Sequence, residues 1–153
     1  MLSIETAMTR HGDTQESDYV RQRLYALDGE NTSGALEHVN LYLRDADGTL
    51  CGGLLGQQYW NCMFIDILWI EPRFRGMGYG RRLMSEIEAI ARARGLDLLH
   101  LDAQGLEVPG FYTKLGFEMF GVLDDTPRGY QRYFMVKRLT KPDPSCSRRP
   151  AGS

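Results

Sequence analysis

The sequence predicts one mixed α/β domain, and a strand–turn–helix–strand unit near its middle supports this most strongly. Residues 61–72 (NCMFIDILWIEP) form the most hydrophobic stretch and are rich in β-forming residues, which indicates a buried central strand that ends at Pro72. A glycine-rich turn, a helix over residues 80–94 and a strand over residues 96–102 follow. Because a helical crossover returns the chain parallel to its first strand, at least one strand pair should be parallel.

A strand, a helix and a hairpin are predicted before this unit. Residues 2–8 fit a short first strand, and residues 16–27 carry apolar side chains at near-helical spacing, which predicts an amphipathic helix. Residues 37–44 alternate apolar and polar side chains, Asp47-Gly48 is a strong hairpin signal, and residues 49–58 form the returning strand. Three glycines of the returning strand indicate bulges or close backbone approach: Gly52, Gly53 and Gly56.

A helical stripe and several turn residues define the elements after the glycine turn. The helix over residues 80–94 ends before Gly95, which stands where a C-terminal cap belongs. Its apolar stripe consists of Leu83, Met84, Ile87 and Ile90. A short helix over residues 109–114 has a proline near its first turn, and strands over residues 117–122 and 130–139 complete the domain.

Length and composition set the domain organisation. The chain has 153 residues, of which 42% are hydrophobic, so we expect one domain with one core over residues 1–139. Residues 140–153 contain three prolines and little apolar content, which predicts a disordered tail.

Charge and cysteine content exclude several classes of protein. The net charge is −2, with 18 basic and 20 acidic residues, which argues against a nucleic-acid partner. Three cysteines without a CxxC pair form no disulfide framework, and neither a signal peptide nor an apolar run of membrane-spanning length is visible. We therefore expect a cytoplasmic protein with no membrane partner. No His, Cys or Asp cluster has metal-ligand spacing, and His100 is interpreted as a hydrogen-bonded core residue.

The glycine turn between the central strand and its helix is a candidate phosphate site. Free backbone N–H groups and the positive end of the helix dipole meet there, and glycines let a ligand approach the backbone. The dinucleotide pattern G-x-G-x-x-G fails because Arg81 stands where its third glycine would be, and a P-loop fails because the chain has no Gly-Lys pair. Residues 75–80 (RGMGYG) instead match the pattern [RQ]-x-x-G-x-[GA].

This pattern resembles the signature of the GNAT superfamily of N-acetyltransferases, which lies after a long strand and before a helix. Residues 69–72 (WIEP) are similar to the end of the family's strand, and residues 111–117 (FYTKLGF) resemble its Y-x-K-L-G-F motif. The order of elements also matches over roughly residues 2–139. The resemblance implies the GNAT fold, an α/β (α+β) domain with a mixed central sheet of about six to seven strands and flanking helices.

The resemblance also implies acetyl-CoA as the acetyl donor. In the family, amides of the glycine turn hold the pyrophosphate, and the preceding strand splays from its parallel neighbour, which leaves amides for the acetyl oxygen and the pantetheine arm. The implied cofactor-binding residues are Leu68, Trp69, Ile70, Arg75, Gly76, Met77, Gly78, Tyr79, Gly80 and Arg81. Many members have an asparagine after the next strand, where this chain has Gly105; Gln104 or the backbone alone could replace that contact.

Two residues are candidates for proton transfer. Tyr112 occupies the motif tyrosine that points at the CoA sulfur in many members, so the resemblance implies a general acid; the alternative is a core tyrosine. Asp66 lies within the apolar central strand and is the candidate base or amine-binding group, because burial would raise its pKa toward a useful value. Strand alternation places it on one face with Phe64, Leu68 and Ile70. The alternative for Asp66 is a structural acid bonded to a neighbour.

The predicted function is N-acetyl transfer from acetyl-CoA to a primary amine by direct attack in a ternary complex. The compact, slightly acidic chain favours a small cationic acceptor, such as a polyamine, an antibiotic or an amino-acid-like amine. The alternatives are a non-catalytic GNAT module that holds CoA as a sensor or partner subunit, and a protein or peptide N-acetyltransferase. No motif identifies the acceptor, and a homodimer is common in the family.

Overall fold

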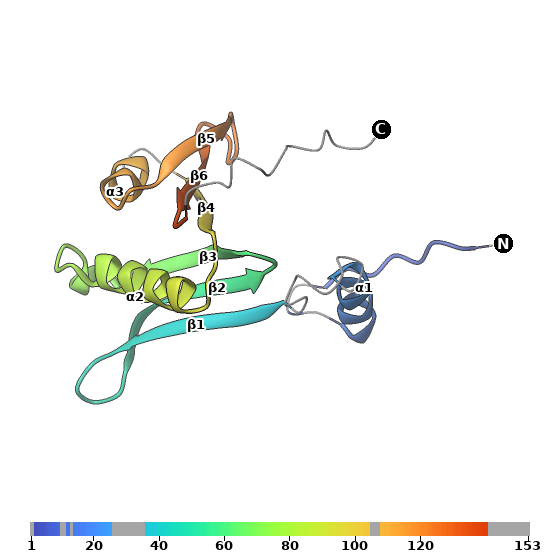
Figure 1. Ribbon diagram of the computed structural model, residues 1–153, viewed down its shortest axis with the longest axis horizontal. Coiled ribbons are helices and arrows are strands. Elements are labelled where there is room, and N and C mark those ends of the chain that lie inside the picture. Colours follow the sequence, from blue (N-terminus) through green and yellow to red (C-terminus); the bar gives the residue numbers. More distant parts are fainter. Residues whose placement is uncertain (1, 10–11, 13, 26–35, 105–107, 141–153) are drawn as a thin grey trace.

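A computed structural model of the chain describes residues 2–9, 12, 14–25, 36–104 and 108–140 (Figure 1). Six strands and four helical segments make up this part of the chain. In chain order they are α1 (Gln15–Tyr25), β1 (Glu37–Arg44), β2 (Leu50–Tyr59), β3 (Cys62–Ile70), the 3-10 helix η2 (Pro72–Phe74), α2 (Tyr79–Ala93), β4 (Leu98–Gln104), α3 (Val108–Lys114), β5 (Glu118–Leu123) and β6 (Arg132–Arg138). No helix among them is long and apolar enough to span a membrane.

The six strands form one sheet in the order β1-β2-β3-β4-β6-β5. The pair β3–β4 is parallel, and the other neighbouring strands are antiparallel. The parallel pair arises because α2 lies between the two strands in the chain and returns β4 to the start of β3. The predicted mixed sheet with flanking helices is therefore confirmed, and so is its parallel pair.

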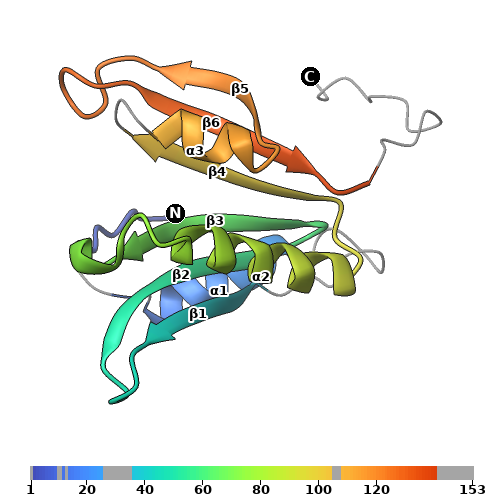
Figure 2. The same ribbon diagram turned by 90° about the vertical axis from the view of Figure 1, so that its left-hand side faces the viewer.

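The parallel pair joins only the first halves of its two strands. Cys62 to Ile65 of β3 pair with Leu98 to Leu101 of β4, after which β3 continues to Ile70 with β2 alone and β4 continues with β6 alone. Figure 2 shows β3 and β4 diverging toward their C-terminal ends, where the N-terminus of α2 also lies. We call the space between the diverging strands the wedge.

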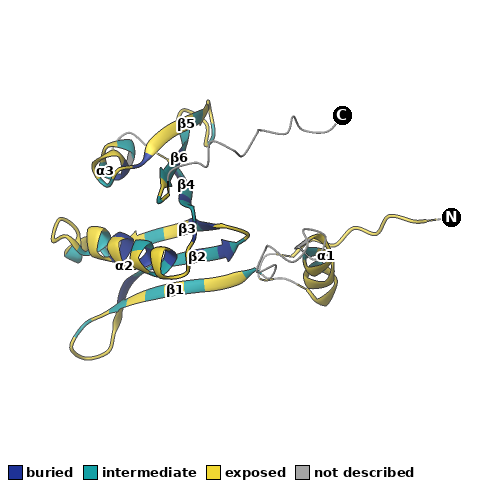
Figure 3. Cartoon of the chain, viewed as in Figure 1, coloured by how far each residue is buried: buried dark blue, intermediate teal, exposed yellow. Residues whose placement is uncertain are grey.

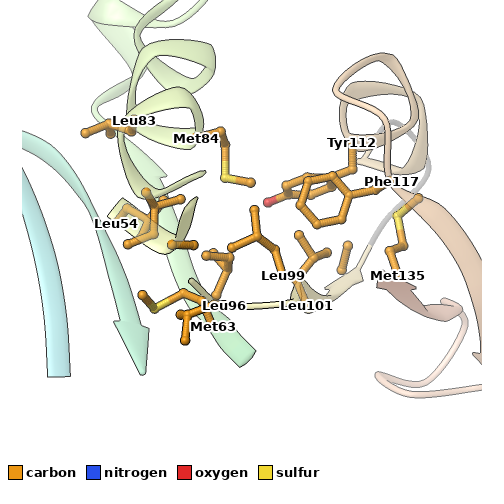
Figure 4. Close-up of a cluster of buried hydrophobic side chains, with 14 of the residues drawn as sticks. Leu54, Met63, Leu83, Met84, Leu96, Leu99, Leu101, Tyr112, Phe117 and Met135 are labelled. Carbon is orange, nitrogen blue, oxygen red and sulfur yellow. The ribbon is translucent and has the colours of Figure 1, made fainter. Parts of the chain in front are cut away.

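The core fills the angle between α2, α3 and the middle of the sheet (Figure 4). The predicted stripe of α2 supplies Leu83, Met84 and Ile87 to it, and β4 supplies Leu99 and Leu101, all of them buried. At roughly 1.5–3 kcal/mol for each fully buried apolar side chain, this cluster is the main stabilising contact between α2 and the sheet. The opposite face of β4 carries His100 and Asp102, because successive side chains of a strand alternate.

The hairpin β1–β2 forms as its turn and glycine signals predict. Asp45 accepts backbone hydrogen bonds from Asp47 and Thr49 at 2.9 Å each, and Gly48 adopts φ 80°. A Cβ atom on Gly52 would lie 2.6 Å from the carbonyl oxygen of Trp69, and one on Gly53 would lie 2.7 Å from that of Leu41. These glycines therefore allow the close approach of backbone that the sequence indicated.

One prediction for the N-terminal region is wrong, and another is confirmed only in part. Residues 2–8 form no strand, and Leu2, Ile4 and Met8 are more than nine-tenths exposed. An apolar alternation is insufficient for a strand, because a strand also needs a backbone partner. The helix α1 forms, but its stripe residues Tyr19 and Val20 are exposed rather than packed on the core. Figure 3 shows that most of α1 is coloured as exposed. The end of that stripe and nearly all of the predicted tail lie outside the described residues.

Candidate functional site

One cavity of about 820 Å³ lies beside the wedge. Its walls come from the C-terminal end of β3, the glycine turn with the first turn of α2, and the helix α3. Nine of the ten predicted donor-binding residues line it: Leu68, Trp69, Ile70, Arg75, Gly76, Gly78, Tyr79, Gly80 and Arg81. The tenth, Met77, is 63% exposed and stands outside the lining. The residues that the family resemblance implied for donor binding therefore lie, with the exception of Met77, around one cavity.

The N-terminus of α2 opens into this cavity. Gly78 is its N-cap with φ 86°, and Gly76 has φ 76°, conformations that glycine adopts without strain. The first turn of α2 contains no acidic residue and two arginines, Arg81 and Arg82. Because positive charge opposes the helix dipole at this end, a bound anion would relieve an unfavourable arrangement. The turn therefore suits a phosphate.

The arginines around the glycine turn make different contacts. Arg75 donates a hydrogen bond from Nε to the carbonyl of Ile70 at 2.8 Å, which closes the base of the turn. Arg73 does not line the cavity; it pairs with Glu71 at 3.0 Å and stacks on Phe74, which does line it. Arg81 lines the cavity and is available to a bound phosphate.

Lys114 and Phe111 also line the cavity, although neither was predicted to bind the donor. They lie three residues apart on α3, so they share one face of that helix. This spacing within the FYTKLGF motif is the signal that could have identified them. Gly80 explains how Phe111 fits, because a Cβ atom there would lie 3.4 Å from the Cζ atom of Phe111.

Asp66 lies at a β-bulge, which corrects the predicted face of β3. Gly56 pairs with Ile65 and Leu55 pairs with Ile67, so Asp66 is an extra residue of β3 opposite β2. The extra residue reverses the alternation. Leu68 and Ile70 therefore share the face of Ile65 and the core, whereas Phe64 lies on the opposite face.

Asp66 is also exposed, so the burial argument made for its carboxylate does not apply. It is the first residue of β3 beyond the last pair with β4, and Asp102 is the corresponding residue of β4. Asp66 thus stands at the narrow end of the wedge. Backbone groups of β3 that face away from β2 are unpaired with β4 from this point onward, as the resemblance implied for a splayed strand.

Tyr112 lies behind the cavity wall rather than in it. Its side chain is buried, with 8% exposed, and its ring packs against those of Phe111 and Phe117 at 5.0 and 5.8 Å. Figure 4 shows its hydroxyl oxygen pointing from α3 toward Met84 of α2. Burial raises the pKa of the phenol, which keeps it protonated. Its role as an acid stays a prediction.

The face of the sheet turned away from α2 carries a second polar cluster. The hydroxyl of Tyr59 lies 2.8 Å from Nε2 of His100, and the ring of Phe64 lies 5.0 Å from the imidazole. Burial lowers the pKa of His100, and the neighbouring Asp102 partly opposes this. Asp102 itself forms an ion pair with Arg132. His100 is hydrogen-bonded as predicted, but it is half-buried on this face and lies outside the core cluster.

The C-terminal end of β4 is where the family's asparagine contact was expected. Gln104, the candidate replacement, is exposed at the end of the strand, and Gly105 lies outside the described residues. Within the described ranges, no three His, Cys, Asp or Glu side chains gather in a way that could hold a metal ion.

Several known proteins are similar to this chain in sequence and in fold. The profile of the acetyltransferase (GNAT) family matches residues 4–117. Blasticidin-S acetyltransferase of Streptomyces morookaense is 33% identical over 105 residues, which cover 68% of this chain and 77% of that protein. A crystal structure of an acetyltransferase from Bacillus cereus has a TM-score of 0.72 and 33% identity, covering 87% of this chain and 98% of that one.

A further solved structure contains coenzyme A. The paia N-acetyltransferase of Thermoplasma acidophilum, in complex with coenzyme A, has a TM-score of 0.54 and 25% identity. The match covers 65% of this chain and 60% of that one.

Proposed function

The chain is an acyltransferase of the GNAT acetyltransferase family, and we propose that it moves the acetyl group of acetyl-CoA to a primary amine of a small cationic acceptor. The observation that carries the proposal is the cavity beside the wedge, which unites the glycine turn, the N-terminus of α2 and the splayed end of β3. We also propose that the amine attacks the acetyl group directly in a ternary complex.

The residues of the cavity fit coenzyme A. Backbone N–H groups after Gly78 and the dipole of α2 suit a pyrophosphate, and Arg81 and Lys114 add positive charge. Leu68, Trp69 and Ile70 lie where the unpaired edge of β3 can bind the pantetheine arm and the acetyl oxygen. When bound, acetyl-CoA supplies an activated thioester. The chain itself positions the reactants and moves protons.

Proton transfer is assigned to Asp66 and Tyr112. An alkylamine has a pKa near ~10.4 and is mostly charged at neutral pH, so it must lose a proton before it attacks. Asp66, exposed at the narrow end of the wedge, attracts the ammonium and accepts that proton directly or through water. The nitrogen then bonds to the acetyl carbon while the carbon–sulfur bond breaks. Tyr112 donates its proton to the departing thiolate, the nitrogen loses its second proton to water, and the Tyr112 phenolate regains a proton from water.

The acceptor class rests on charge and on one relative. The chain has a net charge of −2, and Asp66 places a carboxylate beside the wedge. The name of the relative from Streptomyces morookaense says that it acetylates blasticidin S. We therefore propose an antibiotic-like amine before a polyamine or an amino acid.

A thiol-release assay tests the proposal. The purified chain is incubated with acetyl-CoA and, separately, with blasticidin S, a streptothricin, an aminoglycoside, spermidine, free amino acids and a peptide. We expect thiol release and an acetylated product with at least one small cationic amine. Release with the peptide alone would assign the chain to the protein N-acetyltransferases, and release with none of them would contradict the proposal.

A further inference from the structure

A second concave surface lies on the face of the sheet that is turned away from α2. It consists of two cavities, of about 290 and 460 Å³, that share Tyr59 and His100. The smaller one is also lined by Phe64, Asp102 and Phe134. We call these five residues the aromatic bowl. The volumes are of the order seen for small-molecule sites, about 300–1,000 Å³.

The rings of the aromatic bowl are held in place before any ligand arrives. The hydrogen bond between Tyr59 and His100 fixes both rings, and the plane of Phe64 lies only 35° from that of His100. Phe134 on β6 stands opposite Asp102 in the strand register and completes the far wall. Because these rings need little further ordering, a flat molecule can stack on them at a small entropic cost.

The composition of the bowl differs from that of the packed face. On β4, the residues facing α2 are Leu99, Leu101 and Ala103, all apolar and buried. The residues facing the bowl are His100 and Asp102. Aromatic walls with a few fixed polar groups are typical of small-molecule sites.

Charge within the bowl is balanced. The carboxylate of Asp102, with 16% of its side chain exposed, is paired with the guanidinium of Arg132. The bowl is therefore expected to select ligands by the shape of their ring more than by their net charge. The ammonium group of an acceptor would be attracted by Asp66 instead.

The strand register places the bowl directly beside the wedge. Ile65 and Leu101 form the last pair of the parallel strands, and Leu101 stands between His100 and Asp102 of the bowl on β4. Asp66 follows on β3. Leu68, two residues further, lines the cavity of about 820 Å³ beside the wedge, which we call the donor cavity. At about 3.3 Å per residue, Phe64 of the bowl and Leu68 of the donor cavity lie roughly 13 Å apart along β3, on opposite faces of the strand. A chain of a few methylene groups on a ring in the bowl would therefore carry an amine toward the wedge.

We propose that the aromatic bowl is the acceptor site, and that the acceptor is an amine carrying a flat aromatic or heteroaromatic ring on a short chain. This inference rests on the proposed function and narrows it. It places linear polyamines below ring-bearing amines as substrates, although both are cationic.

The test compares matched pairs of amines. Phenylalkylamines with spacers of one to four methylene groups are set against the corresponding cyclohexylalkylamines, which have the same charge and similar size without a flat ring. We expect the wild-type kcat/KM to favour the aromatic member by about 2- to 12-fold at the best spacer length. The preference should persist at high salt, because it depends on stacking.

Two variants and one control locate the preference. Phe64→Leu and Phe134→Leu should each bring the aromatic-to-cyclohexyl ratio close to one, and either variant can serve if the other fails to fold. Tyr42→Leu is the control, because Tyr42 is an aromatic residue on the same sheet face but lies on β1, 57% exposed and outside the bowl. Isothermal titration of the CoA-saturated protein with each amine gives the same comparison without turnover.

The outcomes separate the two proposals. Acetylation without an aromatic preference, or a preference that survives both bowl variants, would overturn the acceptor site and leave the proposed function intact. Absence of thiol release with every amine would contradict the proposed function. The isothermal titration alone would then show whether the bowl binds aromatic amines. Binding of aromatic amines that is lost in Phe64→Leu and retained in Tyr42→Leu supports it.

Discussion

The donor site can be tested by adding one methyl group at either end of α2. Gly78 begins the helix with φ 86°, and Gly95 follows its other end with φ 70°. A Cβ atom at either position would meet no other atom within 4 Å. Gly78→Ala and Gly95→Ala therefore impose the same kind of backbone strain, but only Gly78 lines the donor cavity.

The two variants should lose similar stability and different affinity. The left-handed conformation costs a residue with a Cβ atom about 1–2 kcal/mol, which corresponds to a fall in Tm of about 2–8 °C for a domain of this size. In Gly78→Ala, relief of the strain also turns the following N–H groups away from the phosphate. Loss of one hydrogen bond to a charged group, about 1.5–3 kcal/mol, weakens CoA binding about 10- to 150-fold.

Thermal melts of the free protein and titration with CoA measure the two effects separately. We expect matched falls in Tm, with the affinity for CoA reduced only in Gly78→Ala. Equal CoA affinity in both variants, after matched falls in Tm, would refute the assignment of the turn as the phosphate site.

Three further predictions concern charge and proton transfer. Arg81→Gln should weaken CoA binding about fivefold, as expected for a partly exposed ion pair, whereas Arg73→Gln, outside the cavity, should leave the Kd unchanged; equal effects would argue against a specific role. Tyr112→Phe should lower kcat about 10²- to 10⁴-fold with little change in CoA affinity. Burial raises the pKa of the Tyr112 phenol above its ordinary value of 10.0, so deprotonation of Tyr112 should not reduce the wild-type kcat below that pH. Full activity of Tyr112→Phe would exclude the acid role. Burial would raise the pKa of Glu88, but hydrogen bonds from Lys137 and Arg92 outweigh it and lower the pKa below the ordinary 4.5. The stability that Glu88 contributes above that pH is therefore lost as the pH falls through the lowered value, and denaturant unfolding of Glu88→Gln should show a weaker acid dependence below pH 4.5, together with a loss of about 1.5–3 kcal/mol at pH 7.

Elements with strong local signals were predictable from the sequence. The stripe of α2 and the turn after β1 fixed the ends of their elements to within two residues of the observed bounds. The glycine pattern also placed Arg75, Gly76, Gly78, Tyr79, Gly80 and Arg81 on one surface, because these residues follow one another in the same turn. Their binding of the acetyl donor stays a prediction.

Features that depend on pairing between distant segments were not predictable. The bulge at Asp66 reverses a face of β3 and arises from register with β2, which no local pattern encodes. Residues 2–8 alternate like a strand but have no backbone partner. The aromatic bowl combines Tyr59 of β2, Phe64 of β3, His100 and Asp102 of β4, and Phe134 of β6, so only the strand order brings it together.

A crystal structure of the protein with coenzyme A tests the central claim most directly. We predict the pyrophosphate against the backbone N–H groups that follow Gly78, and the thiol at the splayed end of β3 near Leu68. Coenzyme A bound at another surface, or no binding at saturating concentration, would contradict the assignment of this cavity to the acetyl donor.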